Sequence, residues 1–508
     1  MKYLNILLLV LLIGLISLSE FVNGVIKVDP TTQFLIDESY RVRLFHGVNV
    51  VYKIPPYYPS TGEFDPITSL NQQDIDNLVG WGFNAVRLGV MWPGVEPVEG
   101  DYNSTYLDTM KSIVDLLGNS DVYTIVDFHQ DLISRKFCGE GIPDWAVSLN
   151  ASTNFPKPME KPYPVNTQGY PALDTCLNKE FAEYYFSEEV GQTFQALYSN
   201  TNGLRDKFVN YWKQLATLFL DSQTVLGYEI INEPWPGDIY ADPKLLIDLG
   251  YADKVNLLPL YQIVNQAIRE IDNQHCVFFE KALSDVYESF FPAGTPGGVE
   301  YNDRQVYSYH IYCGTDRSGN PRHQYVCDSE ENIFFNGAMR DLKRIGGGGF
   351  MTEFGAVSNS TNSIGMLEFM TSTADKYLQS WTYWAFKYYN DLTTAGSSES
   401  LYLPNGQLDV IKVKSLSRTY AQAIAGIPLY MNFDPLSSDF QFKYYINTSI
   451  SEPTIIYLNQ EFYYSNGFTV NITTGDAMYK VVEPNNVYVI PTSTTINNSL
   501  IVVNINKN

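Results

Sequence analysis

Eight short apolar runs, rich in β-branched and aromatic residues, alternate with stretches of helical periodicity between residues 40 and 390. The expected strands are Leu44–Val50, Ala85–Val90, Tyr123–His129, Val225–Asn232, Val277–Glu280, Val306–Tyr312, Gly349–Gly355 and Ser380–Phe386. The expected helices, with apolar residues at three- and four-residue intervals, are Asn71–Trp81, Tyr106–Leu117, Arg205–Leu220, Leu260–Ile271, Gly337–Ile345 and Ile364–Tyr377. This alternation predicts a parallel sheet closed into a (β/α)8 barrel, the TIM barrel. An open, doubly wound sheet is the alternative, but no Gly-x-Gly-x-x-Gly loop follows the first strand.

The chain changes character near residue 427. Helical periodicity stops there, and short alternating runs follow at Phe440–Tyr445, Thr454–Leu458, Gly467–Ile472, Val487–Pro491 and Ser499–Ile505. Such runs predict a small antiparallel β-sandwich. We therefore divide the chain into a leader at residues 1–24, a barrel at 25–426 and a β-sandwich domain at 427–508. Within the barrel, the connection 130–223 is very long, and long ordered insertions at strand ends often form binding loops or lids.

The first residues are typical of a signal peptide. Met1 and Lys2 precede an apolar stretch from Leu4 to Leu18, and small residues follow around residues 22–24. A membrane anchor is the alternative, but the stretch is shorter than the roughly 20 residues that a spanning helix needs. We expect the mature protein to be secreted or lysosomal. Six Asn-x-Ser/Thr sequons fit that route: Asn103, Asn150, Asn359, Asn447, Asn471 and Asn497.

The five cysteines favour two disulfides and one free thiol. Cys138 and Cys176 lie in one loop region, and Cys313 and Cys327 lie in another, so we expect these two pairs. Cys276 directly precedes an apolar run, and we expect it to be a buried free thiol. The sequence has no Cys-x-x-Cys pair, no His-x-x-x-His and no nucleotide or flavin motif. We therefore expect no metal and no cofactor.

Residues capable of chemistry gather at the C-terminal ends of the expected strands, where barrels of this class place their active sites. They are Asn49, Lys53, Arg87, Asp127, His129, Asn232, Glu233, Glu280, His310, Tyr312, Glu353, Trp384 and Lys387. Glu233 ends the fourth strand and Glu353 the seventh. One such glutamate is more often an ion-pair partner than a catalyst. Two carboxyl groups that face one pocket, however, are what the cleavage of a glycosidic bond needs.

This ordered set resembles glycoside hydrolase family five over roughly residues 26–426. The resemblance is carried by Asn232-Glu233-Pro234, Arg87 in Asn84–Leu88, His129, His310-Ile311-Tyr312, Glu353 and Trp384. It implies a retaining glycosidase, with Glu233 as the acid/base and Glu353 as the nucleophile. Arg87 would keep Glu353 ionised and Tyr312 would donate a hydrogen bond to it. Asn232 would bond the 2-hydroxyl of the sugar.

Within that family, four features are similar to endoglycoceramidases, which cleave between the glycan and the ceramide of glycosphingolipids. They are Val48–Lys53, Asp127–Asp131, Gly141–Ala146 and the appended β-sandwich. The resemblance implies that Lys53, Asp127, His129 and His310 hold the sugar next to the cut bond, with Trp384 as the floor beneath it. Apolar residues within 137–155 and 163–194 would line a channel for ceramide. Glu280 has a suitable position but no clear role.

Three other functions remain open to this sequence. A glucosylceramidase or steryl-glucosidase of the same family would differ only in the depth of its pocket. A β-glucanase or mannanase would act on polysaccharide, and a non-catalytic carbohydrate-binding barrel would have lost one carboxylate, whereas both are present. The net charge of −23 argues against nucleic acid as a partner, because phosphate binding needs basic surface. We expect a monomer whose partners are a glycosphingolipid and, through it, the surface of a membrane.

Overall fold

The computed structural model describes residues 24–147, 149, 154–316, 318–391, 393 and 397–508. The predicted leader at residues 1–24 lies outside the described residues apart from Gly24, and so does the sequon at Asn150. Across the described ranges, no helix combines the length and apolarity needed to cross a membrane.

Eight parallel strands close into a barrel, and each overlaps one of the eight predicted runs. In order around the barrel they are β4 (His46–Val50), β5 (Ala85–Gly89), β6 (Tyr123–Asp127), β7 (Val225–Glu229), β8 (Cys276–Phe279), β9 (Gln305–Ile311), β10 (Gly348–Phe354) and β11 (Ser380–Tyr383). Nearly every residue of these strands is buried, because one face packs inside the barrel and the other beneath helices. The predicted TIM barrel is confirmed.

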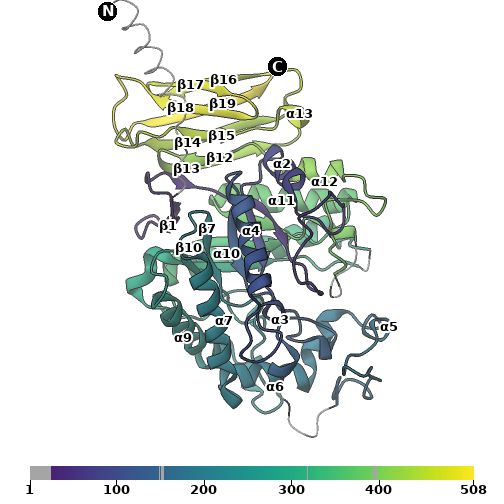
Figure 1. The fold of residues 1–508 in the computed structure, drawn as a ribbon. Helices are drawn as coiled ribbons and strands as arrows, with labels where there is room; N and C mark the ends of the chain where they lie inside the picture. Colours follow the sequence, from purple (N-terminus) through teal and green to yellow (C-terminus); the bar gives the residue numbers. More distant parts are fainter. Residues whose placement is uncertain (1–23, 148, 150–153, 317, 392, 394–396) are drawn as a thin grey trace, which may run out of the picture.

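Helices follow the strands and cover the outside of the barrel (Figure 1). The main ones are α2 (Gln72–Gly80), α4 (Ser104–Gly118), α7 (Leu204–Phe219), α9 (Leu258–Arg269), α10 (Gln324–Ile345), α11 (Thr361–Tyr377) and α12 (Val410–Leu416). Asn71 starts α2 through a capping box with Asp74, which satisfies two backbone N–H groups at the helix end. Helix α10 begins at Gln324 rather than at the predicted Gly337, because its acidic first half hides the apolar periodicity.

The long insertion after β6 folds into short helices at the C-terminal end of the barrel strands. They are the 3-10 helices η1 (Arg135–Phe137), η2 (Asp144–Ala146) and η3 (Phe181–Phe186), and the α-helices α5 (Leu173–Cys176) and α6 (Glu188–Tyr198). A disulfide joins Cys138 to Cys176 across the insertion. The Phe155 ring packs between Phe137 and Tyr184, with ring centroids 5.6 Å and 5.4 Å apart. These contacts join the insertion to the main apolar core of the barrel.

Short elements fill the remaining connections. They are α3 (Trp92–Val95), η4 (Thr201–Gly203), α8 (Lys244–Ile247), the π-helical turn η5 (Asp253–Leu257), η6 (Val299–Arg304), η7 (Ser397–Glu399) and α13 (Gln460–Tyr463). The second disulfide joins Cys313, after β9, to Cys327 in α10. Cys276 is a buried free cysteine.

Two antiparallel sheets form the β-sandwich at the far end of the molecule from α3, α5 and α6 (Figure 1). One sheet has the order β1 (Lys27–Val28), β2 (Leu35–Ile36), β3 (Val42–Arg43), β12 (Tyr420–Ile424), β15 (Thr454–Tyr457), β18 (Asn486–Pro491) and β17 (Ala477–Val482). The other has the order β13 (Gly426–Asp434), β14 (Asp439–Ile446), β19 (Leu500–Lys507) and β16 (Phe468–Thr474). Their buried faces share one apolar core.

The sandwich begins before the predicted boundary at residue 427. Strand β12 starts at Tyr420, and the N-terminal strands β1 to β3, which we assigned to the barrel, pair with it through Val42 and Ile424. The reason is geometric, because the chain enters β4 and leaves α12 at the same end of the barrel. The segments on either side therefore meet and complete one sheet. Two-residue strands are too short to show any periodicity in the sequence.

Candidate active site

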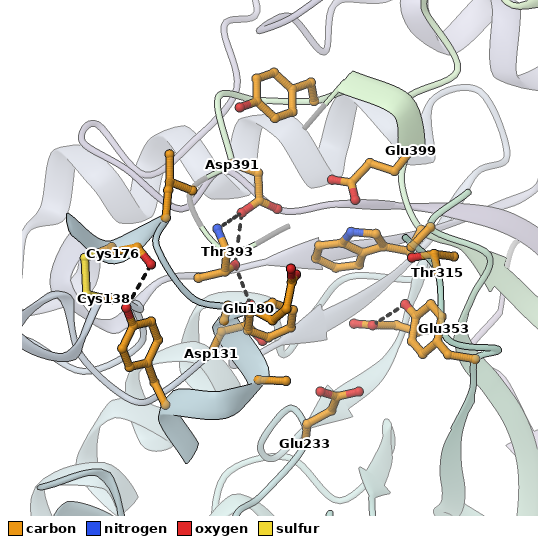
Figure 2. Close-up of a pocket in the computed structure, with 18 of the residues that line it drawn as sticks. Asp131, Cys138, Cys176, Glu180, Glu233, Thr315, Glu353, Asp391, Thr393 and Glu399 are labelled. Atoms are coloured by element: carbon orange, nitrogen blue, oxygen red, sulfur yellow. Dashed lines mark hydrogen bonds between the residues drawn. A yellow bond between two sulfur atoms is a disulfide. The ribbon is translucent and has the colours of Figure 1, made fainter. Parts of the chain in front are cut away.

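Glu233 and Glu353 project into one cavity of about 1000 Å³ at the C-terminal ends of the barrel strands (Figure 2). Glu233 follows β7, while Glu353 lies in β10. One carboxylate oxygen of each residue lies within 4.8 Å of the other. A carboxyl separation of about 5 Å leaves no room for water between the groups and the sugar, whereas inverting enzymes need about 6.5–9.5 Å. The spacing fits the retaining reaction.

Glu353 is held by hydrogen bonds at both oxygens. Arg87 Nη1 donates to Oε1 at 2.5 Å, and the Tyr312 hydroxyl donates to Oε2 at 2.7 Å. A β-bulge between Met351 and Glu353 turns the strand so that Glu353 pairs with His310 of β9. Burial raises the pKa of Glu353, and the cations of His310 and Arg87 oppose that rise. The pKa of Glu353 is raised overall. We expected Arg87 to depress this pKa below its ordinary value, but Arg87 only limits the rise.

Glu233 is held by groups from three neighbouring strands. His310 Nδ1 lies 2.8 Å from Glu233 Oε1, and His310 Nε2 lies 2.8 Å from Glu280 Oε1. The backbone of Glu233 has φ of 39°, a left-handed conformation that costs a non-glycine residue about 1 kcal/mol or more. Glu280 Oε2 accepts a hydrogen bond from this backbone N–H, and Gln130 Nε2 donates to the Glu233 carbonyl. These two side chains fix the strained peptide.

Arg87 is fully buried and connects the two halves of the site. Its guanidinium donates to Asn232 Oδ1 at 2.8 Å, lies 3.1 Å from Asp127 Oδ1 and donates from Nε to Glu229. Glu229 was not among the site residues expected from the sequence. Its signal was a carboxylate inside an otherwise apolar predicted strand, where a charged side chain needs a partner.

An aromatic floor lies beside the two carboxylates. The Trp384 indole stacks on His129 with ring centroids 5.1 Å apart and 20° between the planes. His129 Nδ1 lies 2.8 Å from Asp127 Oδ2 and Nε2 lies 3.4 Å from Asp131. Burial opposes the charged form of His129, but the two carboxylates outweigh it and raise the pKa of His129 to about 9. An imidazolium beside an aromatic ring suits the hydroxyl groups of a sugar.

Lys53 sits in a buried carboxylate cluster behind this floor. Its Nζ lies 2.7 Å from Asp131, 3.0 Å from Asp391 and 3.2 Å from Glu140, and 4.7 Å from the Trp384 ring centroid. Burial opposes its charge, but these carboxylates raise the pKa of Lys53 well above the ordinary value. Thr393 Oγ1 links Asp131 to Asp391, as Figure 2 shows. Asp131, Asp391 and Thr393 reach the cavity, whereas Lys53 does not.

Comparison with known proteins decides the family. Residues 60–390 match the family model described as cellulase (glycosyl hydrolase family 5), and residues 418–505 match the glycoside hydrolase family 5 C-terminal domain. The chain belongs to glycoside hydrolase family 5. It is a glycosidase, and the predicted family and class of enzyme are confirmed.

Two relatives named endoglycoceramidase resemble this family 5 glycosidase over most of its length. The one from Cyanea nozakii is 38% identical over 473 residues, which are 92% of this chain and 91% of the relative. The one from Hydra vulgaris is 38% identical over 465 residues, 91% of this chain and 86% of the relative. The structure of a lactosyl-enzyme intermediate of endo-glycoceramidase II from Rhodococcus sp. has a TM-score of 0.72 at 20% identity, covering 94% and 99% of the two chains. That last likeness concerns the fold.

The ten predicted site residues of this family 5 glycosidase divide into two layers. Those that line the cavity are Glu233, Glu353, Tyr312, His129 and Trp384. Those that contact them from behind are Lys53, Arg87, Asp127, Asn232 and His310. The structure thus brings all ten together. It also adds Glu140, Asp131, Asp391, Glu229 and Glu280, to which the sequence by itself gave no role.

The remaining wall of the cavity is largely apolar. The insertion after β6 contributes Leu173, Leu177, Phe181, Ala182 and Tyr184, together with the charged Lys179 and Glu180. Leu173 and Leu177 are 49% and 54% exposed, so they lie at the rim and not in the core of the insertion. The opposite wall comes from the connections after β9 and β10, residues 312–316 and 355–356. The cavity therefore combines a polar end around Trp384 with an apolar rim.

Proposed function

We propose that this glycosidase hydrolyses the bond between the oligosaccharide and the ceramide of glycosphingolipids, with retention at the anomeric carbon. The observation that carries the proposal is a single cavity that combines two close carboxylates, a polar end floored by Trp384 and a wall with apolar residues of the insertion after β6. A sugar needs the polar end, and a ceramide needs the apolar residues of the wall. The endoglycoceramidases from Cyanea nozakii and Hydra vulgaris, similar over some nine tenths of this chain, support the same substrate.

In the first step, Glu353 attacks the anomeric carbon while Glu233 donates its proton to the glycosidic oxygen. The bond from carbon to the ceramide oxygen breaks, and ceramide leaves as the neutral alcohol. Arg87 and Tyr312 hold both Glu353 oxygens, which aims the nucleophile and keeps it from rotating. His310 holds Glu233 at one oxygen. The sugar is left bonded to Glu353 as an ester.

In the second step, Glu233 accepts a proton from water, and the resulting hydroxide oxygen attacks the anomeric carbon. The ester bond to Glu353 breaks and the free oligosaccharide leaves. Two inversions at one carbon give net retention. Asn232 supports both steps from behind the cavity wall, because it accepts a hydrogen bond from Arg87 and donates one to the Gln130 carbonyl. This role differs from the bond to the sugar 2-hydroxyl that we expected.

We assign the polar end to the sugar next to the cut bond. Trp384 forms its floor, and His129 and Asp131 supply charged groups for its hydroxyls. Lys53, Asp127 and His310 act from behind by fixing these side chains, a role that differs from the direct sugar contact we expected. The ceramide chains pass along Leu173 and Leu177 towards the rim.

We further propose that the mature enzyme is a monomer that works in the secretory, lysosomal or extracellular space at the surface of a membrane. The leader sequence at residues 1–24 supports this route. So do the two disulfides, which form and persist in oxidising compartments. Sequons at Asn103, Asn359, Asn471 and Asn497 carry exposed asparagines, as glycosylation requires.

The decisive experiment incubates purified enzyme with lactosylceramide and with glucosylceramide and identifies the products by mass spectrometry. Release of intact lactose plus ceramide, absent with Glu353→Gln, supports the proposal. If glucose is the only sugar released, and glucosylceramide is the only lipid cleaved, the enzyme belongs with the exo-acting relatives. If the enzyme cleaves a β-glucan and neither lipid, the proposed substrate is wrong although the fold is right.

A further inference from the structure

Exposed apolar side chains follow the outer edge of the insertion after β6. Val165 is 58% exposed, and Leu173 and Leu177 are about half exposed. Phe186 is 45% exposed, and its carbonyl accepts a hydrogen bond at 2.6 Å from the equally exposed Tyr240, in the connection after β7. We call these five side chains the apolar edge. Exposed apolar groups that lie together mark contacts with a membrane or another protein, whereas single ones need no explanation.

The apolar edge borders the mouth of the catalytic cavity. Leu173 and Leu177 belong to both, because they line the cavity wall along which we place the ceramide chains. Phe186 ends the short helix η3, whose Phe181 and Tyr184 line the same wall. Whatever covers the edge therefore also meets the path by which a lipid enters the cavity.

Local structure holds the apolar edge in place. The disulfide between Cys138 and Cys176 fastens helix α5 to the start of the insertion. Val165 forms an antiparallel bridge with Pro171, and the Asn166 side-chain oxygen accepts two backbone N–H groups in the turn between them, at 2.9 Å and 3.0 Å. An edge that is already ordered loses little conformational entropy when it meets a second surface, so its apolar area is available for binding.

We propose that the apolar edge docks on the lipid bilayer that carries the substrate and buries its side chains among the lipid headgroups. The inference rests on the proposed function for the position of the ceramide, and adds to it the surface that meets the membrane. With the bilayer against the edge, a ceramide passes from the acyl chains of the bilayer onto Leu173 and Leu177 without crossing water. A protein partner on the same edge would instead cover these two leucines and obstruct the lipid.

The test measures co-sedimentation of the enzyme with phosphatidylcholine vesicles that contain no glycolipid. Val165→Ser combined with Phe186→Ser should weaken binding about tenfold, equivalent to about 1.4 kcal/mol. Leu436→Ser combined with Ile496→Ser is the matched control, because these side chains are 92% and 75% exposed in the β-sandwich, at the other end of the molecule (Figure 1). Val165→Trp should bind more tightly than the wild type, since tryptophan favours the membrane interface. A wild type that does not bind the vesicles, or that binds them no better than the first variant, would overturn the proposal.

Turnover separates this inference from the proposed function. For Val165→Ser combined with Phe186→Ser, kcat/KM on lactosylceramide in vesicles should fall about tenfold, while kcat/KM on a soluble aryl lactoside stays at the wild-type value. Vesicle binding that depends on the apolar edge, without cleavage of lactosylceramide, would support the docking surface and refute the proposed substrate. Cleavage of lactosylceramide without such binding would do the reverse. Sedimentation velocity gives a further check, because a wild-type dimer that this variant dissociates would make the edge a contact between copies and overturn the proposal.

Discussion

Glu280 accepts a hydrogen bond from the backbone N–H of Glu233 at 3.0 Å, although the two residues follow different strands of the barrel. Its other carboxylate oxygen lies 2.8 Å from His310 Nε2, and His310 in turn contacts the Glu233 side chain. Burial opposes the charged form of His310, but Glu280 and Glu353 raise its pKa well above the ordinary value. Glu280 thus positions both the backbone and the side chain of the proposed acid/base without reaching the cavity.

We predict that Glu280→Gln lowers kcat on glycolipid about 10- to 100-fold while KM changes little. The reason is that Glu233 is no longer held in position and His310 loses a negatively charged partner. A dinitrophenyl lactoside, whose leaving group needs no proton, should lose far less. Steady-state kinetics on both substrates check this, with thermal unfolding as the control for folding. Equal losses on the two substrates would refute a role through the acid/base.

The fall of activity at low pH should follow the protonation of Glu353. Burial raises the pKa of this carboxyl above its ordinary value of 4.5, and the protonated form is no nucleophile. Activity should therefore fall as pH drops through a value above 4.5, as read from kcat/KM, which reports the free enzyme. The dinitrophenyl lactoside is the substrate of choice, since proton donation does not limit it.

His310→Gln should move this fall of activity to higher pH. The reason is that the His310 cation lowers the pKa of Glu353, so its removal lets burial raise that pKa further. If kcat/KM falls at the same pH as in the wild type, or at a lower pH, His310 carries no charge in the free enzyme.

Azide should distinguish the two carboxylates by the configuration of the product. With Glu233→Ala and a dinitrophenyl lactoside, azide replaces water at the ester on Glu353 and should give the β-azide. With Glu353→Ala, azide enters the space of the lost nucleophile and should give the α-azide. Each variant alone should lose at least about 1,000-fold on glycolipid. NMR of the two azides checks the assignment, and the same anomer from both variants would contradict it.

The apolar rim should matter for lipid and not for chemistry. We predict that Leu173→Ser combined with Leu177→Ser raises KM for lactosylceramide about 30-fold, because burial of each leucine against a lipid chain contributes on the order of 1 kcal/mol. KM for the dinitrophenyl lactoside should rise far less. Leu436→Ser, at a leucine 92% exposed in the β-sandwich, is the matched control and should behave as wild type. A loss shared by both substrates would mean that the rim only supports the fold.

Local patterns in the sequence were enough to place the eight barrel strands, and with them Glu233 and Glu353. Each strand is a mostly apolar run because both of its faces are buried, and both glutamates lie at the C-terminal ends of such runs. The pairing of cysteines within single loop regions also agrees with the disulfides of the structure. Local signals missed β1 to β3, whose pairing with β12 depends on residues nearly 400 positions away, such as Val42 and Ile424.

The tertiary structure alone decided which charged groups meet. Lys53 looked like a sugar ligand, but three carboxylates from separate loops, Asp131, Glu140 and Asp391, enclose it. Glu280 gained a role only when strand order placed it beside His310. The direction of the Glu353 pKa also depended on burial outweighing Arg87, which no motif records. Residue type and periodicity are properties of neighbours along the chain, whereas desolvation and ion pairing depend on neighbours in space, and those exist only once the barrel has closed.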